Sequence, residues 1–171
     1  MAEASRLPIG VALGTIGLDG EAWMRAAGRL ASGPIDRLWV WDHLMGRGAP
    51  ERPVLEATSV AAALLAAHPA LRVGTLVLDV TKRHPALVAK IAATLDAIAP
   101  GRFALGIGAG GDAAEHDALG LPFGETGERI DALVRQAAVA RAMLNGDPRE
   151  RLQLPGARSA GGASSSPRPG G

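Results

Sequence analysis

The sequence contains no cysteine, so it can form no disulfide, thiolate metal site, iron–sulfur cluster or cysteine nucleophile. It also lacks a long apolar run. The longest, residues 60–67, is far shorter than the roughly 18 residues that a membrane-spanning helix needs. The first residues show no charged start, apolar core or cleavage site of a secretory signal. We therefore expect a cytoplasmic protein with no membrane partner.

An excess of basic charge is missing as well. The 18 lysine and arginine residues face 17 aspartate and glutamate residues, which gives a net charge of +1. Because a nucleic-acid-binding face normally shows as a clustered basic excess, we expect no nucleic-acid partner. What the chain does have is 47% apolar residues over 171 positions, the composition of one globular domain.

The composition changes near Asp147. Residues 147–171 are rich in glycine, serine, proline and arginine and have almost no apolar periodicity. Such a segment cannot bury enough apolar surface to offset the entropy lost on ordering. We predict a folded domain over residues 1–146 and a disordered tail over residues 147–171.

Within the folded part, short apolar runs alternate with helical patterns. The runs cover residues 7–13, 35–41, 71–78 and 102–107, and the helical patterns cover residues 20–31, 53–67, 84–97 and 125–144. Four such units predict an α/β fold with a parallel sheet and right-handed crossovers. A closed eight-stranded barrel takes about 250 residues, so the units form either the first half of a TIM barrel or an open doubly wound sheet.

A carboxylate and an imidazole follow the second predicted strand, in the sequence Trp41, Asp42, His43. Ligands bind at the carboxyl ends of strands in parallel α/β folds, so these side chains are placed to act on a ligand. His43 can serve as a general base or acid, because the ordinary pKa of imidazole lies near neutrality. The alternative is that Asp42 caps a turn and His43 is a surface histidine.

A glycine-rich segment, residues 106–111, follows the fourth predicted strand. Glycines allow a backbone to approach a phosphate closely and to point its N–H groups at it. The spacing of Gly106, Gly108 and Gly111 formally satisfies the dinucleotide-binding pattern, but that pattern belongs in the first strand–helix unit. The segment therefore favours a phosphate-holding loop over a dinucleotide turn, with a plain tight turn as the alternative.

Two further groups of polar residues are candidates. Lys82, Arg83 and His84 follow the third predicted strand and either hold an anionic group or form an exposed rim, which is the interpretation we favour. No regular metal-ligand spacing occurs, and we predict no metal site. The residues weighed for such a site are Asp42, His43, Asp112, Glu115 and His116.

Taken in order, these motifs resemble the bacterial luciferase-like family of flavin-dependent oxidoreductases. The resemblance spans roughly residues 7–145. Its most specific parts are Trp-Asp-His at 41–43, Arg-Val-Gly-Thr-Leu-Val-Leu at 72–78, His-Pro-Ala-Leu-Val-Ala-Lys at 84–90, Ala-Thr-Leu-Asp at 93–96, Gly-Arg-Phe-Ala-Leu-Gly-Ile-Gly-Ala-Gly-Gly at 101–111, Glu115, Leu-Gly-Leu-Pro-Phe at 119–123, and Glu128 with Arg129.

The resemblance implies the N-terminal half of a TIM barrel that binds FMN or the 8-hydroxy-5-deazaflavin coenzyme F420 at the carboxyl ends of its strands. Hydride or oxygen transfer to a small organic substrate would be its chemistry. It places Asp42 and His43 as catalytic residues beside the reactive face of the cofactor, with His43 transferring a proton. A cis peptide bond between Leu76 and Val77 would back the ring. The remaining cofactor-binding residues would be Gly108, Ala109, Gly110 and Gly111.

The sequence departs from the family in two places. Where the deazaflavin-dependent sugar-phosphate dehydrogenases carry a glutamate after the glycine segment, this chain has Gly111. Members of the family are also about twice as long, so we expect a truncated or frameshifted chain. Open strand edges promote association, and we expect pairing with another half-barrel, most simply a second copy.

Two other functions stay open at this point. One is a non-catalytic remnant or assembly subunit that pairs with a partner half. The other is a Rossmann-like nucleotide binder, in which the glycine segment would lead straight into a helix at Asp112.

Overall fold

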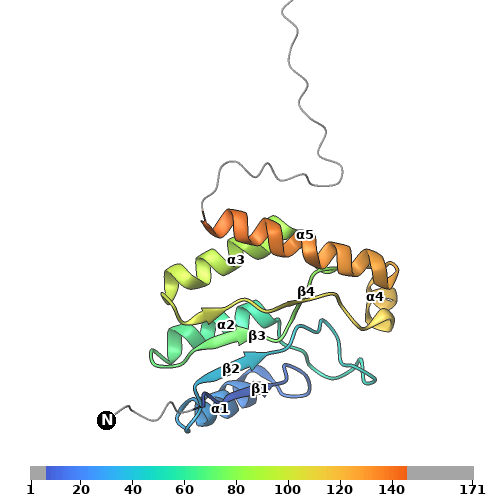
Figure 1. Ribbon diagram of the computed structural model, residues 1–171. Coiled ribbons are helices and arrows are strands. Elements are labelled where there is room, and N and C mark those ends of the chain that lie inside the picture. Colours follow the sequence, from blue (N-terminus) through green and yellow to red (C-terminus); the bar gives the residue numbers. More distant parts are fainter. Residues whose placement is uncertain (1–6, 146–171) are drawn as a thin grey trace, which may run out of the picture.

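The computed structural model describes residues 7–145 (Figure 1). The tail predicted for residues 147–171 lies outside the described residues. Within the described part, strands and helices alternate as the sequence predicts. The elements are β1 (Gly10–Leu13), α1 (Gly20–Ala31), β2 (Arg37–Val40), α2 (Ala57–Ala67), β3 (Val73–Thr75), β4 (Leu78–Asp79), α3 (Pro85–Ile98), β5 (Phe103–Ala104), β6 (Ile107–Gly108), α4 (Ala113–Leu119) and α5 (Thr126–Asn145).

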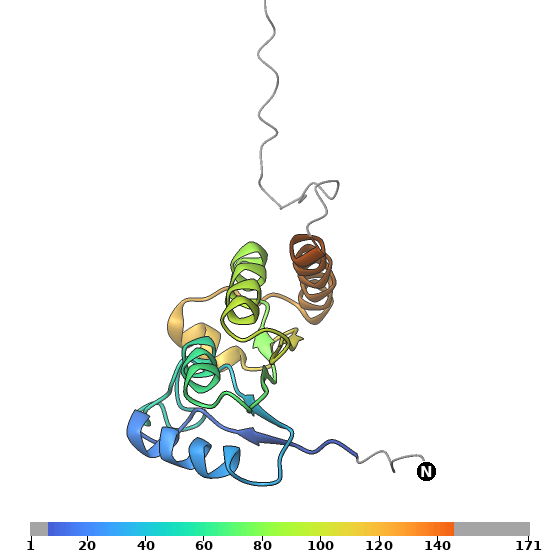
Figure 2. The same cartoon turned by 90° about the vertical axis from the view of Figure 1, so that its left-hand side faces the viewer.

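The strands join the sheet in the order in which they occur along the chain. β1, β2, β3 and β5 form a parallel sheet in that order, and β4 pairs in parallel with β6. Viewed roughly end-on, α1, α2, α3 and α5 form an arc outside the strands (Figure 2). Successive strands with helices on one side are the arrangement of half a TIM barrel.

This strand order overturns the Rossmann-like alternative. A doubly wound sheet reverses its strand order at the switch point where the ligand binds, and this sheet has no reversal. The glycine segment does lead straight into α4, as that alternative required, since Asp112 is the N-cap of the helix. The strand order is nevertheless that of half a barrel.

The apolar core lies between the helices and the outer face of the sheet. Trp23 of α1, Leu38 of β2, Leu64 of α2 and Val73 of β3 are all fully buried in one cluster. The only polar atom of the Trp23 side chain is satisfied, because its indole N–H donates to the Gly14 carbonyl at 2.8 Å. Burial of these side chains fixes each helix against the strands that flank it.

Two of the predicted strands are each broken in two. Residues 71–78 divide into β3 and β4 on either side of Leu76–Val77, and residues 102–107 divide into β5 and β6 beside Gly106. The Leu76–Val77 peptide bond is cis, as predicted. At the break the Thr75 hydroxyl donates to the Gly106 carbonyl at 2.8 Å and accepts from the Gly106 N–H at 3.0 Å. The Gly106 carbonyl also accepts from the Leu78 N–H at 2.8 Å, so the side chain of Thr75 adds to the backbone hydrogen bonds at the break.

Two helix predictions need correction. α2 begins at Ala57 and not at residue 53, because Pro53 and Leu55 bond through their backbones to Gly17 and Thr15 in the loop after β1. The predictions also omitted α4. Its N-cap, Asp112, accepts a hydrogen bond from the Glu115 N–H at 3.1 Å. No helix within residues 7–145 is long and apolar enough to cross a membrane.

Candidate functional site

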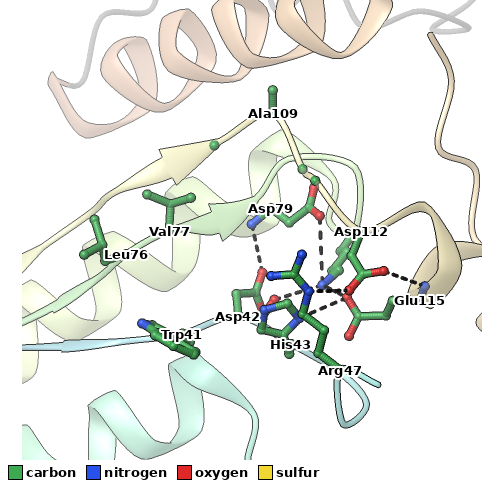
Figure 3. A pocket seen from close by; sticks show the side chains of 14 residues that line it. Trp41, Asp42, His43, Arg47, Leu76, Val77, Asp79, Ala109, Asp112 and Glu115 are labelled. Atoms are coloured by element: carbon green, nitrogen blue, oxygen red, sulfur yellow. Dashed lines mark hydrogen bonds and ion pairs between the residues drawn. The ribbon is translucent and has the colours of Figure 1, made fainter. Parts of the chain in front are cut away.

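A cavity of about 470 Å³ opens at the carboxyl ends of the strands (Figure 3). It brings together every site residue that the sequence predicted, from three separate segments of the chain. Its lining is Trp41, Asp42, His43, Arg47, Leu76, Val77, Asp79, Lys82, Gly108, Ala109, Gly110, Gly111, Asp112 and Glu115.

One wall of the cavity is apolar. Trp41, Leu76 and Val77 are 41%, 48% and 38% exposed, which is high for large hydrophobic side chains that line a concave surface. Gly108 adjoins this wall, and a Cβ built on it would lie only 2.3 Å from Cγ2 of Val77. Glycine at 108 therefore lets β6 pass close to the exposed valine. The surface so formed suits the face of a flat aromatic ring.

The glycine segment forms a second edge of the cavity. Gly110 has a φ of +79° and packs so closely on Asp79 that a Cβ there would lie 2.7 Å from Oδ1 of that side chain. A Cβ on Gly111 would meet nothing within 4 Å. At Gly111 the segment presents backbone and open space to the cavity. At Gly110 its positive φ disfavours any residue other than glycine.

Asp42 is buried in the site, and its carboxylate accepts three hydrogen bonds. Both of its oxygens accept from Arg83, at 2.6 and 2.8 Å, and Oδ2 also accepts from the Asp79 N–H at 2.8 Å. Arg83 reaches Glu56 as well, at 2.8 Å. Burial by itself would lower the pKa of Arg83, but the two carboxylates outweigh it and raise that pKa. Asp42 thus holds segments of the chain together at the edge of the cavity.

Lys82 and Glu115 form a second buried ion pair, with Nζ and Oε2 2.5 Å apart and side chains 2% and 3% exposed. Burial would raise the pKa of Glu115, but hydrogen bonds from Lys82, Leu44 and Met45 and the Lys82 charge lower it. The expectation that Lys82 and Arg83 form an exposed rim is wrong. Both are drawn inward by the carboxylates opposite them, and only His84 is exposed, at the N-cap of α3.

His43 stands between this polar layer and the cavity. Its side chain is 22% exposed, and Nδ1 is buried without a hydrogen-bond partner, 3.5 Å from Oε2 of Glu115. Its ring meets that of Trp41 edge-on, with centroids 6.4 Å apart. An imidazole in this place can hold or transfer a proton beside the apolar wall.

Sequence reasoning did not find the role of His116. This histidine is fully buried, with Nδ1 2.7 Å from the Asp112 carbonyl and Nε2 2.5 Å from the Thr81 hydroxyl. The hydroxyl of Thr81 donates in turn to Oδ1 of Asp79 at 2.6 Å. The adjacent Glu115 and His116 were weighed only as metal ligands, and within residues 7–145 no three such side chains are grouped to hold a metal ion.

Comparisons with known proteins agree with this geometry. Residues 17–171 match the family described as luciferase-like monooxygenase. A relative named F420-dependent glucose-6-phosphate dehydrogenase, from Beutenbergia cavernae, is 35% identical over 122 residues, which are 71% of this chain and 33% of that protein. Pyrimidine monooxygenase RutA of a Caulobacter species is 44% identical over 62 residues, 35% of this chain and 18% of that protein.

Solved structures show the same fold. A structure of an F420-dependent secondary alcohol dehydrogenase superposes with a TM-score of 0.70 at 24% identity, over 79% of this chain and 41% of that one. The monooxygenase RslO1 of Streptomyces bottropensis gives 0.64 at 20% identity, over 80% and 42%. The chain spans about a third of the length of the curated relatives it matches. It is the N-terminal half of the barrel, and it belongs to the luciferase-like monooxygenase family.

Proposed function

We propose that the cavity binds the ring system of FMN or of the deazaflavin coenzyme F420, and that the chain is part of an oxidoreductase acting on a small organic substrate. The observation that carries the proposal is the shared cavity, in which an imidazole from His43 borders an apolar wall wide enough for a ring. Such a flavin or deazaflavin, when bound, supplies hydride transfer or oxygen activation.

The residues present fit a group of this shape. Trp41, Leu76 and Val77 offer exposed apolar surface to the face of a ring. The open backbone at Gly111 leaves room for a polar edge. Among the described residues, the buried Nδ1 of His43 has no hydrogen-bond partner. The side chain therefore keeps unused hydrogen-bonding capacity beside the cavity.

The residues divide the work between them. His43 holds or moves a proton at its exposed ring edge, since its other nitrogen is buried against Glu115. Asp42 keeps the loop after β2 in place through Arg83 and the Asp79 N–H. Three relatives are named F420-dependent glucose-6-phosphate dehydrogenases, which favours the deazaflavin. Gly111, in the place of that branch's glutamate, disfavours a sugar-phosphate substrate.

A titration tests the proposal. The purified chain is titrated with FMN and, separately, with coenzyme F420, and cofactor fluorescence is followed. We expect saturable binding of one of them, weakened about tenfold or more by Trp41→Ala, because an aromatic contact of this kind contributes about 1–3 kcal/mol. Asp117→Asn, an exposed change on α4, is the matched control. A folded chain that binds neither cofactor contradicts the proposal.

We also propose pairing with another half-barrel. In the described part of the chain, β1 and β5 each pair on one side only. Beside β1, Leu7 and Ile9 are 81% and 55% exposed, and on α5 Val134 is 64% exposed. Apolar side chains next to open strand edges favour association. Sedimentation equilibrium of the chain should show a dimer, and a stable monomer would count against pairing with itself.

A further inference from the structure

The backbone of His43 is held on both of its sides by one buried ion pair. Before it, the Asp42 carbonyl accepts from Nζ of Lys82 at 2.8 Å. After it, the Leu44 N–H donates to Oε1 of Glu115 at 2.5 Å, and the Met45 N–H donates to the same oxygen at 3.0 Å. The loop that carries His43 is therefore clamped at the peptide groups on either side of the residue.

The two charges come from different parts of the fold. Lys82 lies between β4 and α3, and Glu115 lies in α4. Burying two charges costs desolvation free energy, which is recovered only when additional hydrogen bonds satisfy the pair. Here those bonds go to the backbone of the loop after β2, so the pair joins three segments at the edge of the cavity (Figure 3).

The same pair also faces the His43 ring. Oε2 of Glu115, which accepts from Lys82, lies 3.5 Å from Nδ1 of His43. Nδ1 has no other partner and is buried. An ionised carboxylate can only accept hydrogen bonds, so the nitrogen that faces it carries the hydrogen. A neutral imidazole protonated at Nδ1 leaves its lone pair on Nε2.

We propose that the Lys82–Glu115 pair is the positioning device of His43: it fixes the backbone on both sides and selects the Nδ1–H tautomer, which makes Nε2 the proton-accepting nitrogen. Both residues act through His43 and are positioning residues. The proposal rests on the proposed function only for what Nε2 exchanges its proton with.

The experiment reads the tautomer directly in the full chain without cofactor. Long-range nitrogen–proton NMR spectra distinguish Nδ1–H from Nε2–H, and His43→Gln assigns the signal among the four histidines. We expect Nδ1–H in the unaltered protein. His116 gives an internal reference, because its nitrogens bond to the Asp112 carbonyl and the Thr81 hydroxyl, so its signal should not depend on the side chain at position 115.

Glu115→Gln, made together with Lys82→Met, should invert the tautomer. Removal of the ammonium leaves the N–H groups of Leu44 and Met45 as the donors to the amide oxygen, so this oxygen takes the place of Oε1 and the NH₂ group takes that of Oε2. A donor then faces Nδ1, which favours Nε2–H. The Leu44 and Met45 amides should exchange with deuterium at least about fivefold faster, because a charged acceptor has been replaced by a neutral one.

Lys82 has a separate signature. Lys82→Met removes the donor to the Asp42 carbonyl and leaves the carboxylate facing Nδ1, so the tautomer should stay Nδ1–H while the loop amides exchange faster. Lys82→Arg keeps the charge and should restore slow exchange. Asp117→Asn, an exposed change on the same helix as Glu115, should alter neither reading.

The outcomes separate this proposal from the proposed function. An inverted tautomer in the Lys82→Met, Glu115→Gln double variant supports the positioning role even if no cofactor binds. An unchanged His43 tautomer in that folded double variant, identified by an unchanged His116 signal, overturns it even if FMN or F420 binds. Equal amide exchange in the Met, Arg and unaltered proteins at position 82 overturns the part assigned to Lys82.

Discussion

The molecule has two buried layers that differ in what they bury. Between the helices and the sheet, Trp23, Leu64 and Val73 are packed side by side with no charge among them. At the carboxyl ends of the strands, Lys82 and Glu115 are almost as deeply buried and carry full charges. Burial alone therefore does not separate core from site.

The difference lies in what each layer tolerates. In the apolar layer every contact between side chains is favourable. The free energy of unfolding that is lost when one side chain is removed therefore grows with the volume of the cavity left behind. In the charged layer each buried charge is compensated by a partner of opposite sign. The loss of one partner leaves the other charge buried without compensation. Such a layer is costly to assemble, and it holds loops such as that around His43 in one geometry.

The largest effect we predict comes from breaking the charged layer. Arg83→Met should lower the free energy of unfolding by about 3–5 kcal/mol, because it leaves the carboxylate of Asp42 buried without its cation. Urea denaturation measures the loss.

A double variant sharpens this prediction. Arg83→Met combined with Asp42→Asn should cost less than the sum of the two single changes, because the second change removes the uncompensated charge. Additive losses would mean that the ion pair contributes no coupling and that the proposed contrast between the layers is wrong.

The apolar layer should respond less steeply. Leu64→Ala should lower the free energy of unfolding by about 3 kcal/mol, since Leu64 is fully buried and its removal leaves a cavity. Leu64→Met keeps the volume and should cost less than about 1.5 kcal/mol. Urea denaturation of both variants tests this, and equal losses would show that packing volume does not set the cost.

Sequence reasoning recovered the apolar layer well. The helix predicted over residues 20–31 matches α1, and the helices predicted over residues 84–97 and 125–144 lie within one residue of α3 and α5 at each end. Apolar spacing carries that information because burial is repeated turn after turn. The breaks in the third and fourth predicted strands were not foreseen, because the hydrogen bonds across them join Thr75 to Gly106, 31 residues away in sequence.

Only some residues of the charged layer could be predicted from the sequence. Most residues lining the cavity were named, because Asp42 and His43 follow a strand and because the motifs resemble a family, but Arg47 and Asp79 were not. The partners of Asp42 could not be predicted, since Arg83 and the Asp79 N–H reach it from another segment of the chain. A long-range ion pair leaves no local pattern, which is why Lys82 and Arg83 were placed on a rim.

The smallest effect should come from Glu56, at the margin between the two layers, where its side chain is 37% exposed. Burial would raise the pKa of Glu56, but hydrogen bonds from Ser59 and Thr58 outweigh it and lower the pKa from 4.5 to about 2. A carboxyl whose pKa is lower in the folded state stabilises the protein above its unfolded pKa and loses that contribution as the pH falls.

Unfolding measured against pH therefore tests Glu56→Gln. The stability advantage of the unaltered protein over this variant should be constant at neutral pH and should shrink as the pH falls from 4.5 towards about 2. Glu51→Gln, an exposed change in the preceding loop, should not reproduce that pH dependence. An advantage that persists unchanged down to about pH 2 would mean that Glu56, the N-cap of α2, acts through packing and not through its charge.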